Sequence, residues 1–389
     1  MQFNTFVSSI RDLERCANAP NLHEILLEPT LLARQGKLSQ ESVYALAIEA
    51  KKRGLRPVLV WDIVMPEQVM VGICDRLKNW DISSFEAIRV CDPGAAYWLL
   101  NHFPLIPLQL IVETGNHNLE SLRGWCELFS PSLERLVLSI ELPQHKLIEY
   151  CQTLPVDCEI LGVGQILLFY SPRSLLAQHL SITNEDWEYI ETTATFEDAK
   201  DRHFPILETA HGTFMFLDKD QFILDRLATL QSAGLHTVSL DLRHLVHDGD
   251  VAVDIDLICQ QIAENPTLLR TTWTKETRAP FFNANRTTAI FPRMKSKLSN
   301  YRNNACLAEV LAGEKGKYVV FYTLRPFDIS QIRRLIVPTG EEIELTQKIA
   351  FRNLNGEQLN TFDSDQILVT DWIKKAVPSS LLMGNIMSG

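Results

Sequence analysis

Six acidic side chains directly follow short apolar runs of the chain, and carboxylates placed in this way can do chemistry. They are Glu28, Asp62, Asp92, Glu113, Glu141 and Asp241. If these runs are strands of one parallel barrel, their carboxyl ends gather at a single mouth. A ring of carboxylates there can bind a cation, position a polar substrate or supply paired acids and bases. The alternative is structural, because acidic residues also end strands and cap the helices that follow them.

Basic side chains are concentrated in residues 270–304. This segment holds eight Lys or Arg and one acid, a net charge of +7, whereas residues 1–269 carry −17 and the whole chain −11. Five aromatic residues are interleaved with the bases: Trp273, Phe281, Phe282, Phe291 and Tyr301. Because Arg and Lys neutralise phosphates and aromatic faces stack on unpaired bases, the segment favours RNA. The alternative is a connector that wraps the acidic body, with its aromatic residues buried and its charges paired.

The chain lacks the short signatures of nucleotide-binding and hydrolytic enzymes. It contains no GxGxxG, GxxxxGK[ST], GxSxG or HExxH, and each of these would have indicated a defined site. Its eight cysteines form no CxxC pair, which favours reduced and mostly buried thiols over a disulfide framework or a zinc ribbon. His211 and His244 stand alone, and isolated histidines are more often structural. Catalytic residues are therefore unknown at this point.

The acidic residues can gather at one mouth only if the chain forms strands that alternate with helices. Eight short apolar runs are expected to be strands: Thr5–Ser8, His23–Leu27, Pro57–Trp61, Ala87–Cys91, Leu108–Val112, Arg135–Ser139, Asp157–Val163 and Thr237–Leu240. Between two of them, residues 39–52 predict an amphipathic helix that ends before Gly54. The alternation predicts an α/β fold with a parallel sheet, and eight strands favour a TIM-like (βα) barrel. The long gap after the seventh strand predicts an insertion at about residues 165–235.

The pattern changes after residue 250. Residues 254–264 predict a helix, and from residue 308 onward turns punctuate short alternating runs, which predicts a small antiparallel β domain, expected to be a barrel. The expected domains are a TIM-like barrel at 1–250, a helix and basic connector at 251–304, and the small β domain at 305–389. No apolar run approaches the ~18 residues of a membrane helix, and the N-terminus shows no basic region followed by an apolar one. We therefore expect a cytoplasmic protein without a membrane partner.

Several stretches along the chain form an ordered set of motifs that begins with Asp92-Pro93-Gly94 and Leu138-Ser139-Ile140-Glu141-Leu142. Together they resemble the collagenase-like peptidases of peptidase family U32, and these two match the family's Asp-Pro-Gly and its Leu-Ser-Arg-Glu-Leu. Residues 159–174 lie on its run that joins a His-Gly pair, a cysteine, a Ser-Gly-Arg and a second cysteine. Leu240-Asp241-Leu242-Arg243 resembles its Ile-Glu-Gly-Arg. The resemblance covers nearly the whole chain, including the β domain.

The cysteines of this family pattern are missing. The resemblance implies an iron–sulfur cluster on four cysteines, and the matching positions here are Leu167, Ser174, a position near Arg202, and Phe222. None of them offers a thiolate, and Leu and Phe cannot ligate iron. We therefore expect no cofactor and no metal site.

The polar residues that survive from the family pattern suggest where a ligand would bind. The expected substrate-binding residues at the barrel mouth are Glu113, Glu141, Arg173, Asp241 and Arg243. The two arginines would hold an anionic group by bidentate contacts while the carboxylates orient polar atoms. The alternative is that both arginines pair with those carboxylates and hold the end of the barrel together.

The resemblance implies more than one role. We expect an RNA-associated factor, active in transfer or ribosomal RNA modification without a cluster, because the +7 segment is the only strong charge feature. Its expected RNA contacts are Arg286, Arg293, Lys295 and Lys297. The alternatives are a peptidase, for which the sequence shows no machinery, and a non-catalytic partner of a related, cluster-bearing family protein.

Overall fold

The computed structural model describes most of the chain. The described residues are 1–112, 116–179, 189–196, 199–247, 251–252, 254–283, 301–302, 305–345 and 349–384. The chain divides into two compact units, Met1–Asn285 and Arg286–Gly389. Within the described part, no helix is long and apolar enough to cross a membrane.

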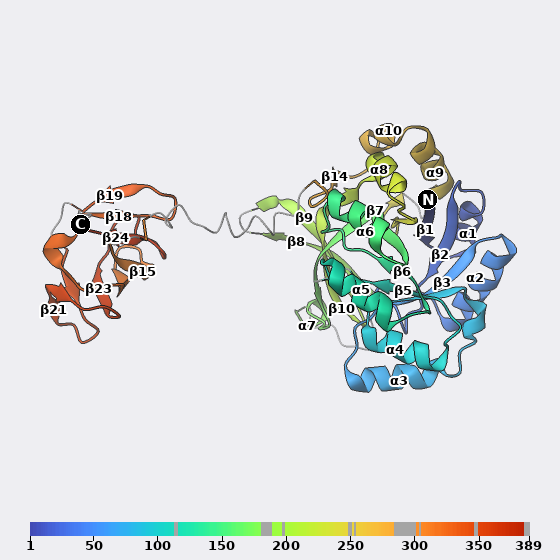
Figure 1. The fold of residues 1–389 in the computed structure, drawn as a ribbon, viewed down its shortest axis with the longest axis horizontal. Coiled ribbons are helices and arrows are strands. Elements are labelled where there is room, and N and C mark those ends of the chain that lie inside the picture. Colours follow the sequence, from blue (N-terminus) through green and yellow to red (C-terminus); the bar gives the residue numbers. More distant parts are fainter. Residues whose placement is uncertain are drawn as a thin grey trace. The chain divides into compact units, whose positions relative to one another are not determined.

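The first unit is built on a closed barrel of eight parallel strands (Figure 1). They are β1 (Gln2–Phe6), β2 (Leu22–Leu27), β3 (Arg56–Trp61), β4 (Ala87–Val90), β5 (Leu108–Ile111), β6 (Leu133–Val137), β7 (Asp157–Ser171) and β11 (Thr237–Leu240). Neighbouring strands pair in this order, and β11 closes the barrel by pairing with both β7 and β1. The predicted TIM-like barrel is confirmed. The first strand spans Gln2–Phe6 rather than the expected Thr5–Ser8, and it includes the polar but buried Asn4.

Helices follow the strands and cover the outside of the barrel (Figure 1). They are α1 (Ile10–Cys16), α2 (Gln40–Lys52), α3 (Glu67–Leu77), α4 (Pro93–His102), α5 (Leu119–Leu128), α6 (Gln144–Thr153) and α8 (Leu227–Ser232). In α2, the helix predicted at 39–52, the Ser39 side chain accepts a hydrogen bond from the Ser42 N–H and caps the helix. It ends before Gly54, which has the positive φ of 74° that glycine tolerates best.

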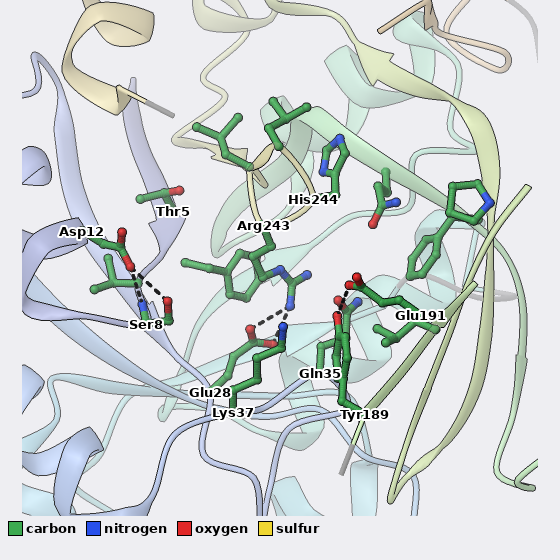
Figure 2. A pocket seen from close by; sticks show the side chains of 18 of the residues that line it. Thr5, Ser8, Asp12, Glu28, Gln35, Lys37, Tyr189, Glu191, Arg243 and His244 are labelled. Atoms are coloured by element: carbon green, nitrogen blue, oxygen red, sulfur yellow. Dashed lines mark hydrogen bonds and ion pairs between the residues drawn. The ribbon is translucent and has the colours of Figure 1, made fainter. Parts of the chain in front are cut away.

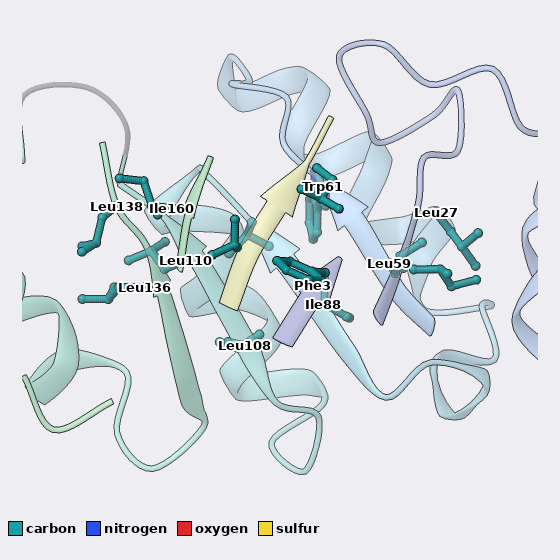
Figure 3. Close-up of a cluster of buried hydrophobic side chains, with 14 of the residues drawn as sticks. Phe3, Leu27, Leu59, Trp61, Ile88, Leu108, Leu110, Leu136, Leu138 and Ile160 are labelled. Carbon is teal, nitrogen blue, oxygen red and sulfur yellow. The ribbon is translucent and has the colours of Figure 1, made fainter. Parts of the chain in front are cut away.

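The two faces of the barrel strands have different environments. Residues such as Leu59, Ile88, Leu110 and Ile160 point outward and form the main core with the helices (Figure 3). The alternate positions point into the barrel, because successive side chains of a strand face opposite sides. A smaller apolar cluster that includes Leu26 occupies part of this interior.

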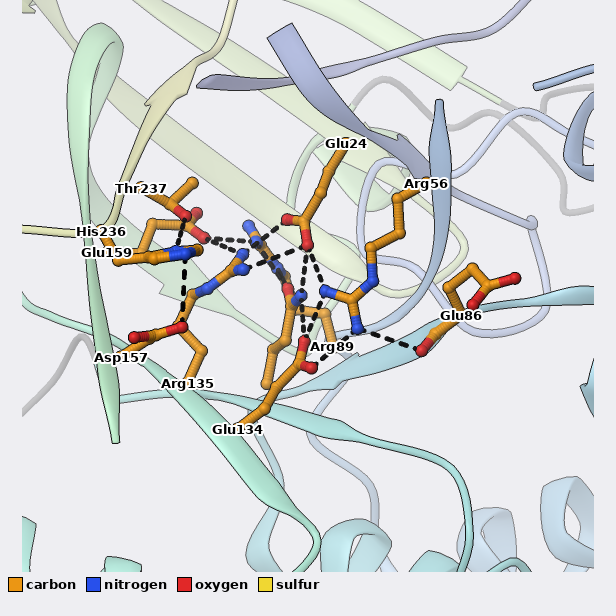
Figure 4. A network of polar contacts seen from close by, with 11 residues as sticks. Glu24, Arg56, Glu86, Arg89, Glu134, Arg135, Asp157, Glu159, His236 and Thr237 are labelled. Carbon is orange, nitrogen blue, oxygen red and sulfur yellow. Dashed lines mark hydrogen bonds and ion pairs between the residues drawn. The ribbon is translucent and has the colours of Figure 1, made fainter. Parts of the chain in front are cut away.

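Charged side chains fill another part of the barrel interior (Figure 4). The network contains three arginines and three glutamates, bridged by an amide: Arg56, Arg89, Arg135, Glu24, Glu134, Glu159 and Gln109. Arg135 NH1 lies 2.5 Å from Glu24 Oε2 and 3.2 Å from Glu159 Oε2, and Arg89 NH2 lies 2.7 Å from Glu159 Oε2. Arg135, Glu24 and Glu159 are almost wholly buried. The equal numbers of acids and bases allow each charge a partner.

The predicted insertion lies between β7 and β11. β7 runs on beyond the barrel and pairs antiparallel with β10 (Gly212–Phe222), which pairs with β9 (Ala199–Thr209) and then β8 (Tyr189–Phe196). The short helix α7 (Leu176–His179) precedes β8, and β14 (Thr277–Arg278) adds to β10 in parallel. The insertion is therefore an extra antiparallel sheet continuous with the barrel.

Two further helices follow the barrel. α9 (Ile255–Glu264), the helix predicted at 254–264, and α10 (Pro266–Thr271) add Cys259 and Leu269 to the main core. A small two-stranded sheet, β12 (Val246–His247) with β13 (Val251–Ala252), precedes them. Short 3-10 helices lie at Ile82–Ser84, Leu224–Arg226 and Ile329–Gln331.

The second unit contains an antiparallel sheet in the order β19-β18-β24-β15-β16-β23-β20-β21. Its strands are β15 (Cys306–Glu314), β16 (Tyr318–Thr323), β18 (Arg334–Ile336), β19 (Glu342–Glu344), β20 (Phe351–Arg352), β21 (Gln358–Leu359), β23 (Ile367–Asp371) and β24 (Leu381–Met383). A separate pair joins β17 (Phe327–Asp328) to β22 (Thr361–Phe362). The antiparallel β domain is confirmed, and within the described residues no pairing joins β19 to β21 to close a barrel.

Candidate active site at the mouth of the barrel

A cavity of about 890 Å³ opens at the carboxyl end of the barrel strands (Figure 2). One wall comes from the end of β1 and the start of α1, including Phe6 and Asp12. The opposite wall comes from the insertion, including Tyr189 on β8, and the floor carries Glu28 and Arg243. The insertion therefore turns the open end of a barrel into a lined pocket, the commonest location of active sites in this fold.

An arginine joins two strand ends on the cavity floor. Arg243 NH1 lies 2.7 Å from both carboxylate oxygens of Glu28, which follows β2. Its Nε and NH2 donate to the carboxylate of Asp241, which follows β11, at 2.9 Å and 2.7 Å. The guanidinium also stacks on the Phe6 ring, 3.6 Å from its centroid. Arg243 is thus fully engaged by groups of this chain, as the structural alternative expected for it.

The two carboxyl groups that bind Arg243 have pKa values shifted in opposite directions. Burial raises the pKa of Glu28 to about 7, and although Arg243 opposes this, Asp62 and Asp241 add to it. Burial also opposes ionisation of Asp241, but the charge and hydrogen bonds of Arg243 outweigh it and hold the pKa of Asp241 below its usual range. At neutral pH, Asp241 is therefore ionised, whereas Glu28 is close to half protonated.

The insertion supplies an aromatic wall to the cavity. The Lys37 ammonium lies 3.8 Å from the centroid of the Tyr189 ring, and the Tyr189 hydroxyl donates to Glu191 Oε1 at 2.6 Å. Burial raises the pKa of Tyr189, and the Glu191 hydrogen bond raises it further. Tyr189 is therefore a neutral phenol whose ring faces a polar pocket.

A second polar group lies at the edge of the same cavity. The carboxylate of Asp220, which is almost wholly buried, contacts His244 Nε2 at 2.8 Å and accepts from Trp273 Nε1 at 3.0 Å. His244 and Lys275 both line the cavity, and Lys275 Nζ lies 4.0 Å from Asp220 Oδ1. Asp220 therefore anchors the start of the basic segment to β10.

Contacts with the insertion close another part of the barrel mouth. The Thr209 hydroxyl donates to the Arg34 carbonyl oxygen at 2.8 Å, and His211 Nε2 lies 2.6 Å from the Thr30 carbonyl oxygen. Below them, Arg34 Nε pairs with Asp62 at 3.0 Å. Of the six predicted carboxylates, Glu28 thus lines the open cavity and Asp241 binds the Arg243 that lines it, while Asp62 pairs with Arg34.

Comparison with known proteins places this fold and site in a family. The sequence model of Peptidase family U32 matches residues 30–249, more than half of the chain. The chain belongs to peptidase family U32. The resemblance inferred from the motifs is thereby confirmed.

Two curated relatives of this U32 protein carry a functional name. It is 22% identical over 260 residues to the tRNA hydroxylation protein P of Escherichia coli, covering 55% of this chain and 57% of that protein. It is 23% identical over 211 residues to the tRNA hydroxylation protein P2 of Bacillus subtilis, covering 53% and 67%. The chain thus spans little more than half the length of the E. coli relative.

Solved structures are similar at low identity. The U32 peptidase Mk0906 matches with 12% identity and a TM-score of 0.34 over 42% of this chain and 70% of that chain. The phosphoribosyl anthranilate isomerase of Thermus thermophilus matches with 10% identity and a TM-score of 0.39 over 68% and 99%.

The remaining sequence-predicted site residues of this U32 protein do not meet in the cavity. Asp92 caps α4 by accepting from the Gly94 and Ala95 N–H groups at 2.7 Å and 3.2 Å, the structural role that acids often have. Glu141 lies 3.4 Å from His117 Nε2, away from the cavity lining. Arg173 is exposed in the loop after β7, also away from the cavity. Glu113 lies outside the described residues.

The start of the basic segment packs on the first unit. Phe282 is buried in the main core, Trp273 packs edge-on against Phe222, and Arg270 NH1 pairs with Asp225 Oδ2 at 2.7 Å. These contacts agree with the alternative in which the segment is a connector with buried aromatic residues and paired charges. The four predicted RNA contacts, Arg286, Arg293, Lys295 and Lys297, lie outside the described residues.

The positions that match the family's cluster ligands do not fit a cluster. Leu167 pairs with Phe216 across β7 and β10 and packs on an apolar patch of the insertion. Arg202 forms an ion pair with Asp218 at 2.6 Å, and Phe222 is buried. Among the described residues, no group of three or more His, Cys, Asp or Glu is placed to hold a metal. The eight cysteines are free thiols, six of them buried.

Sequence reasoning missed the parts of this site that come from the insertion. Tyr189 and Glu191 carry no local pattern, because the fold of the insertion over the mouth brings them there, and Lys37, in the loop between β2 and α2, meets the Tyr189 ring only through that fold. Glu28 did have a signal, its position directly after a predicted strand, but nothing separated it from the other five carboxylates.

Proposed function

We propose that this U32 protein is an RNA-associated factor that acts in tRNA modification in the cytoplasm and does so without an iron–sulfur cluster. The main support is the name shared by its curated relatives, which are tRNA hydroxylation proteins. We propose a role without a cluster because other side chains occupy the positions that match the family's cluster ligands.

The mouth cavity supports this function by its size and lining. A volume of about 890 Å³ can enclose a nucleoside with room for its neighbours. Proteins read single-stranded RNA by stacking unpaired bases on aromatic rings and by hydrogen bonding their edges. Phe6 and Tyr189 supply rings, and Glu28 and Gln35 supply polar groups. A base turned out of an RNA loop is the ligand that best matches this combination.

The basic segment supports RNA binding by its charge. The bases at its start are engaged with the first unit, but residues 284–300 add Arg286, Arg293, Lys295 and Lys297 without any acid. Four cations within twelve residues of sequence can bind several phosphates, which releases counterions and makes the affinity fall steeply with salt. We therefore propose these four residues as contacts to the RNA backbone.

The first test measures binding of the full chain to unmodified tRNA at increasing salt. We expect affinity that weakens steeply with salt and that is lost when Arg286, Arg293, Lys295 and Lys297 are together replaced by Glu. Replacement of Lys315 and Lys317, in the β15–β16 turn, by Glu is a matched control and should matter less. Salt-insensitive binding, or none, would contradict the RNA-associated role.

The second test is cellular. In a strain that lacks the gene, mass spectrometry of tRNA nucleosides should show the loss of one modification. An unchanged nucleoside profile would contradict the proposal. Affinity purification of the full chain from native cells would show whether a related family protein accompanies it, the partner that we propose as the alternative to a solitary factor.

A further inference from the structure

The carboxyl groups of Glu28, which lines the cavity floor, and Asp241, which does not line it, are held differently by the same arginine. The Asp241 carboxylate accepts hydrogen bonds from Nε and NH2 of Arg243. Its Oδ1 also accepts from the Arg243 backbone N–H, with the nitrogen at 3.3 Å. Glu28 receives only NH1, which is 2.7 Å from each of its oxygens. Asp241 therefore has a geometry that fixes an ionised carboxylate, whereas Glu28 shares one donor between two oxygens.

The groups around Glu28 leave it with more negative than positive charge. Asp241 and Arg243 face it from the segment after β11, and Asp62 faces it from the end of β3, where Arg34 neutralises it. Tyr189 from β8 is a neutral phenol, and the Lys37 ammonium is exposed on the ring of that tyrosine. Three carboxyls thus share two guanidiniums on this floor. Protonation of one carboxyl removes the excess negative charge. Glu28 is the carboxyl that receives hydrogen bonds from the fewest donor groups of the arginines, because only Arg243 NH1 donates to it.

We propose that Glu28 is the residue of this cavity that gives and takes a proton, that Asp241 and Arg243 position it, and that its ligand is a neutral heteroaromatic ring of the nucleobase class. The identity of the ligand rests on the proposed function, but the role of Glu28 does not. Neighbouring carboxyls whose environments drive their protonation apart are the usual arrangement of an acid–base site.

The charge distribution argues for a neutral ring rather than an anion. Arg243 is already neutralised by two carboxylates, so an anionic group at the floor would gain little attraction and would face Glu28 and Asp241. The Phe6 and Tyr189 rings both line the cavity, where Arg243 stacks on the first and the Lys37 ammonium lies over the second, so a planar ligand would meet aromatic rings and polar groups together. The edge of a nucleobase carries both N–H donors and carbonyl acceptors, so it can pair with Glu28 in either protonation state.

The first experiment follows the proton on the full chain without any ligand. Protein labelled with ¹³C at the glutamate carboxyl carbon is titrated by NMR from about pH 4 to about pH 9, and the resonance missing in Glu28→Gln belongs to Glu28. We expect this resonance to titrate near neutrality. The exposed Glu120→Gln variant on α5 is the matched control and should leave the Glu28 resonance and its titration unchanged. A Glu28 resonance that titrates only in the acidic range usual for carboxyls would overturn the assignment of Glu28.

The second experiment adds an unmodified tRNA transcript as the probe. Calorimetric titration in two buffers of different ionisation enthalpy counts the protons exchanged on binding. We expect the wild type and Glu28→Asp to exchange a fraction of a proton near neutral pH, and Glu28→Gln to bind without exchange. Equal exchange by wild type and Glu28→Gln would overturn the proposal.

The two experiments separate the inference from the proposed function. If Glu28 titrates near neutrality but tRNA does not bind, the nucleobase ligand and the proposed function fail together while the proton-exchanging role stands. If tRNA binds but Glu28 titrates as an ordinary glutamate, the proposed function stands and the role of Glu28 fails.

Discussion

The barrel contains two clusters of buried arginines and carboxylates, and they differ in balance. In the interior network, three arginines meet three glutamates, and the charges of Arg135, Arg89 and Arg56 overcome the cost of burial to lower the pKa of Glu24 to about 2. At the mouth, three carboxyls share two arginines, and the pKa of Glu28 rises to about 7. The same types of side chain therefore keep a fixed charge in the interior network, whereas at the mouth the protonation of Glu28 can change.

This difference follows from position in the fold. The interior network lies inside a closed barrel, where an unpaired charge would be very costly, so every member has a partner. The mouth cluster borders a cavity that a ligand can enter, so part of its hydrogen bonding can be supplied from outside. We infer that the interior network is structural and the mouth cluster functional, and the following predictions are ordered by the size of the expected effect.

Breaking the interior network should have the largest effect. Arg135→Met leaves Glu24 and Glu159 without their shared partner inside the barrel, and removing one member of a buried ion pair typically costs about 3–5 kcal/mol. We expect a loss of this size in the free energy of unfolding in urea. Arg123→Met, at an exposed pair with Glu120 on α5, is the control and should change it by less than about 1 kcal/mol. Equal effects of the two variants would contradict a structural role for the network.

Removing the titrating group at the mouth should change the pH dependence of stability. Because the pKa of Glu28 rises from 4.5 to about 7 on folding, the folded state binds its proton more tightly. The contribution of Glu28 to stability should therefore be fully present below about pH 4.5 and be lost as the pH rises through about 7, a change of up to about 3 kcal/mol. Glu28→Gln should lose this decline, measured as thermal unfolding across pH. If Glu28→Gln keeps the wild-type pH profile of stability, Glu28 is not the carboxyl that titrates near neutrality.

Loosening the insertion should have a smaller and more local effect. Thr209→Val removes the hydrogen bond to the Arg34 carbonyl oxygen and the one that the Thr209 hydroxyl accepts from the His211 N–H. We expect a cost of about 1–2 kcal/mol and faster amide exchange in β9 and β10, with the barrel strands unaffected. Uniform acceleration across the barrel would mean that the insertion and the barrel unfold as one unit.

The smallest expected effect separates the capping carboxylate from the mouth carboxylates. Asp92→Ala removes the cap of α4 and should cost about 1 kcal/mol, while leaving the pH profile governed by Glu28 intact. Thermal unfolding of the variant at about pH 5 and about pH 8 measures both quantities. A changed pH dependence would place Asp92 in the mouth cluster after all.

The fold was largely predictable from the sequence because its signals are local. Each barrel strand is a short apolar run between helical patterns, and α2 carries its cap at Ser39 and its buried face in a regular repeat. The interior network was not predictable, because Glu24 and Arg135 sit in otherwise apolar runs and meet across the barrel, 111 positions apart in the chain.

The candidate site was only partly predictable for the same reason. Asp241 and Arg243 stand in a family motif at a strand end, so the sequence placed them at the mouth. Tyr189 enters the cavity through an insertion whose pairing over the barrel is a tertiary event. Arg173 was expected beside Arg243, but β7 continues beyond the barrel to Ser171 and carries the following loop away from the cavity.

The most direct test of the account compares mouth variants by their effect on tRNA in cells that lack the native gene. Glu28→Gln and the control Glu120→Gln are expressed at equal levels, and the tRNA nucleosides are quantified by mass spectrometry. The account predicts that Glu120→Gln restores the missing modification fully, whereas Glu28→Gln, although folded, restores less than about a tenth of it, a loss within the range of general acid–base catalysis. Full restoration by Glu28→Gln would contradict the claim that the mouth cluster is functional.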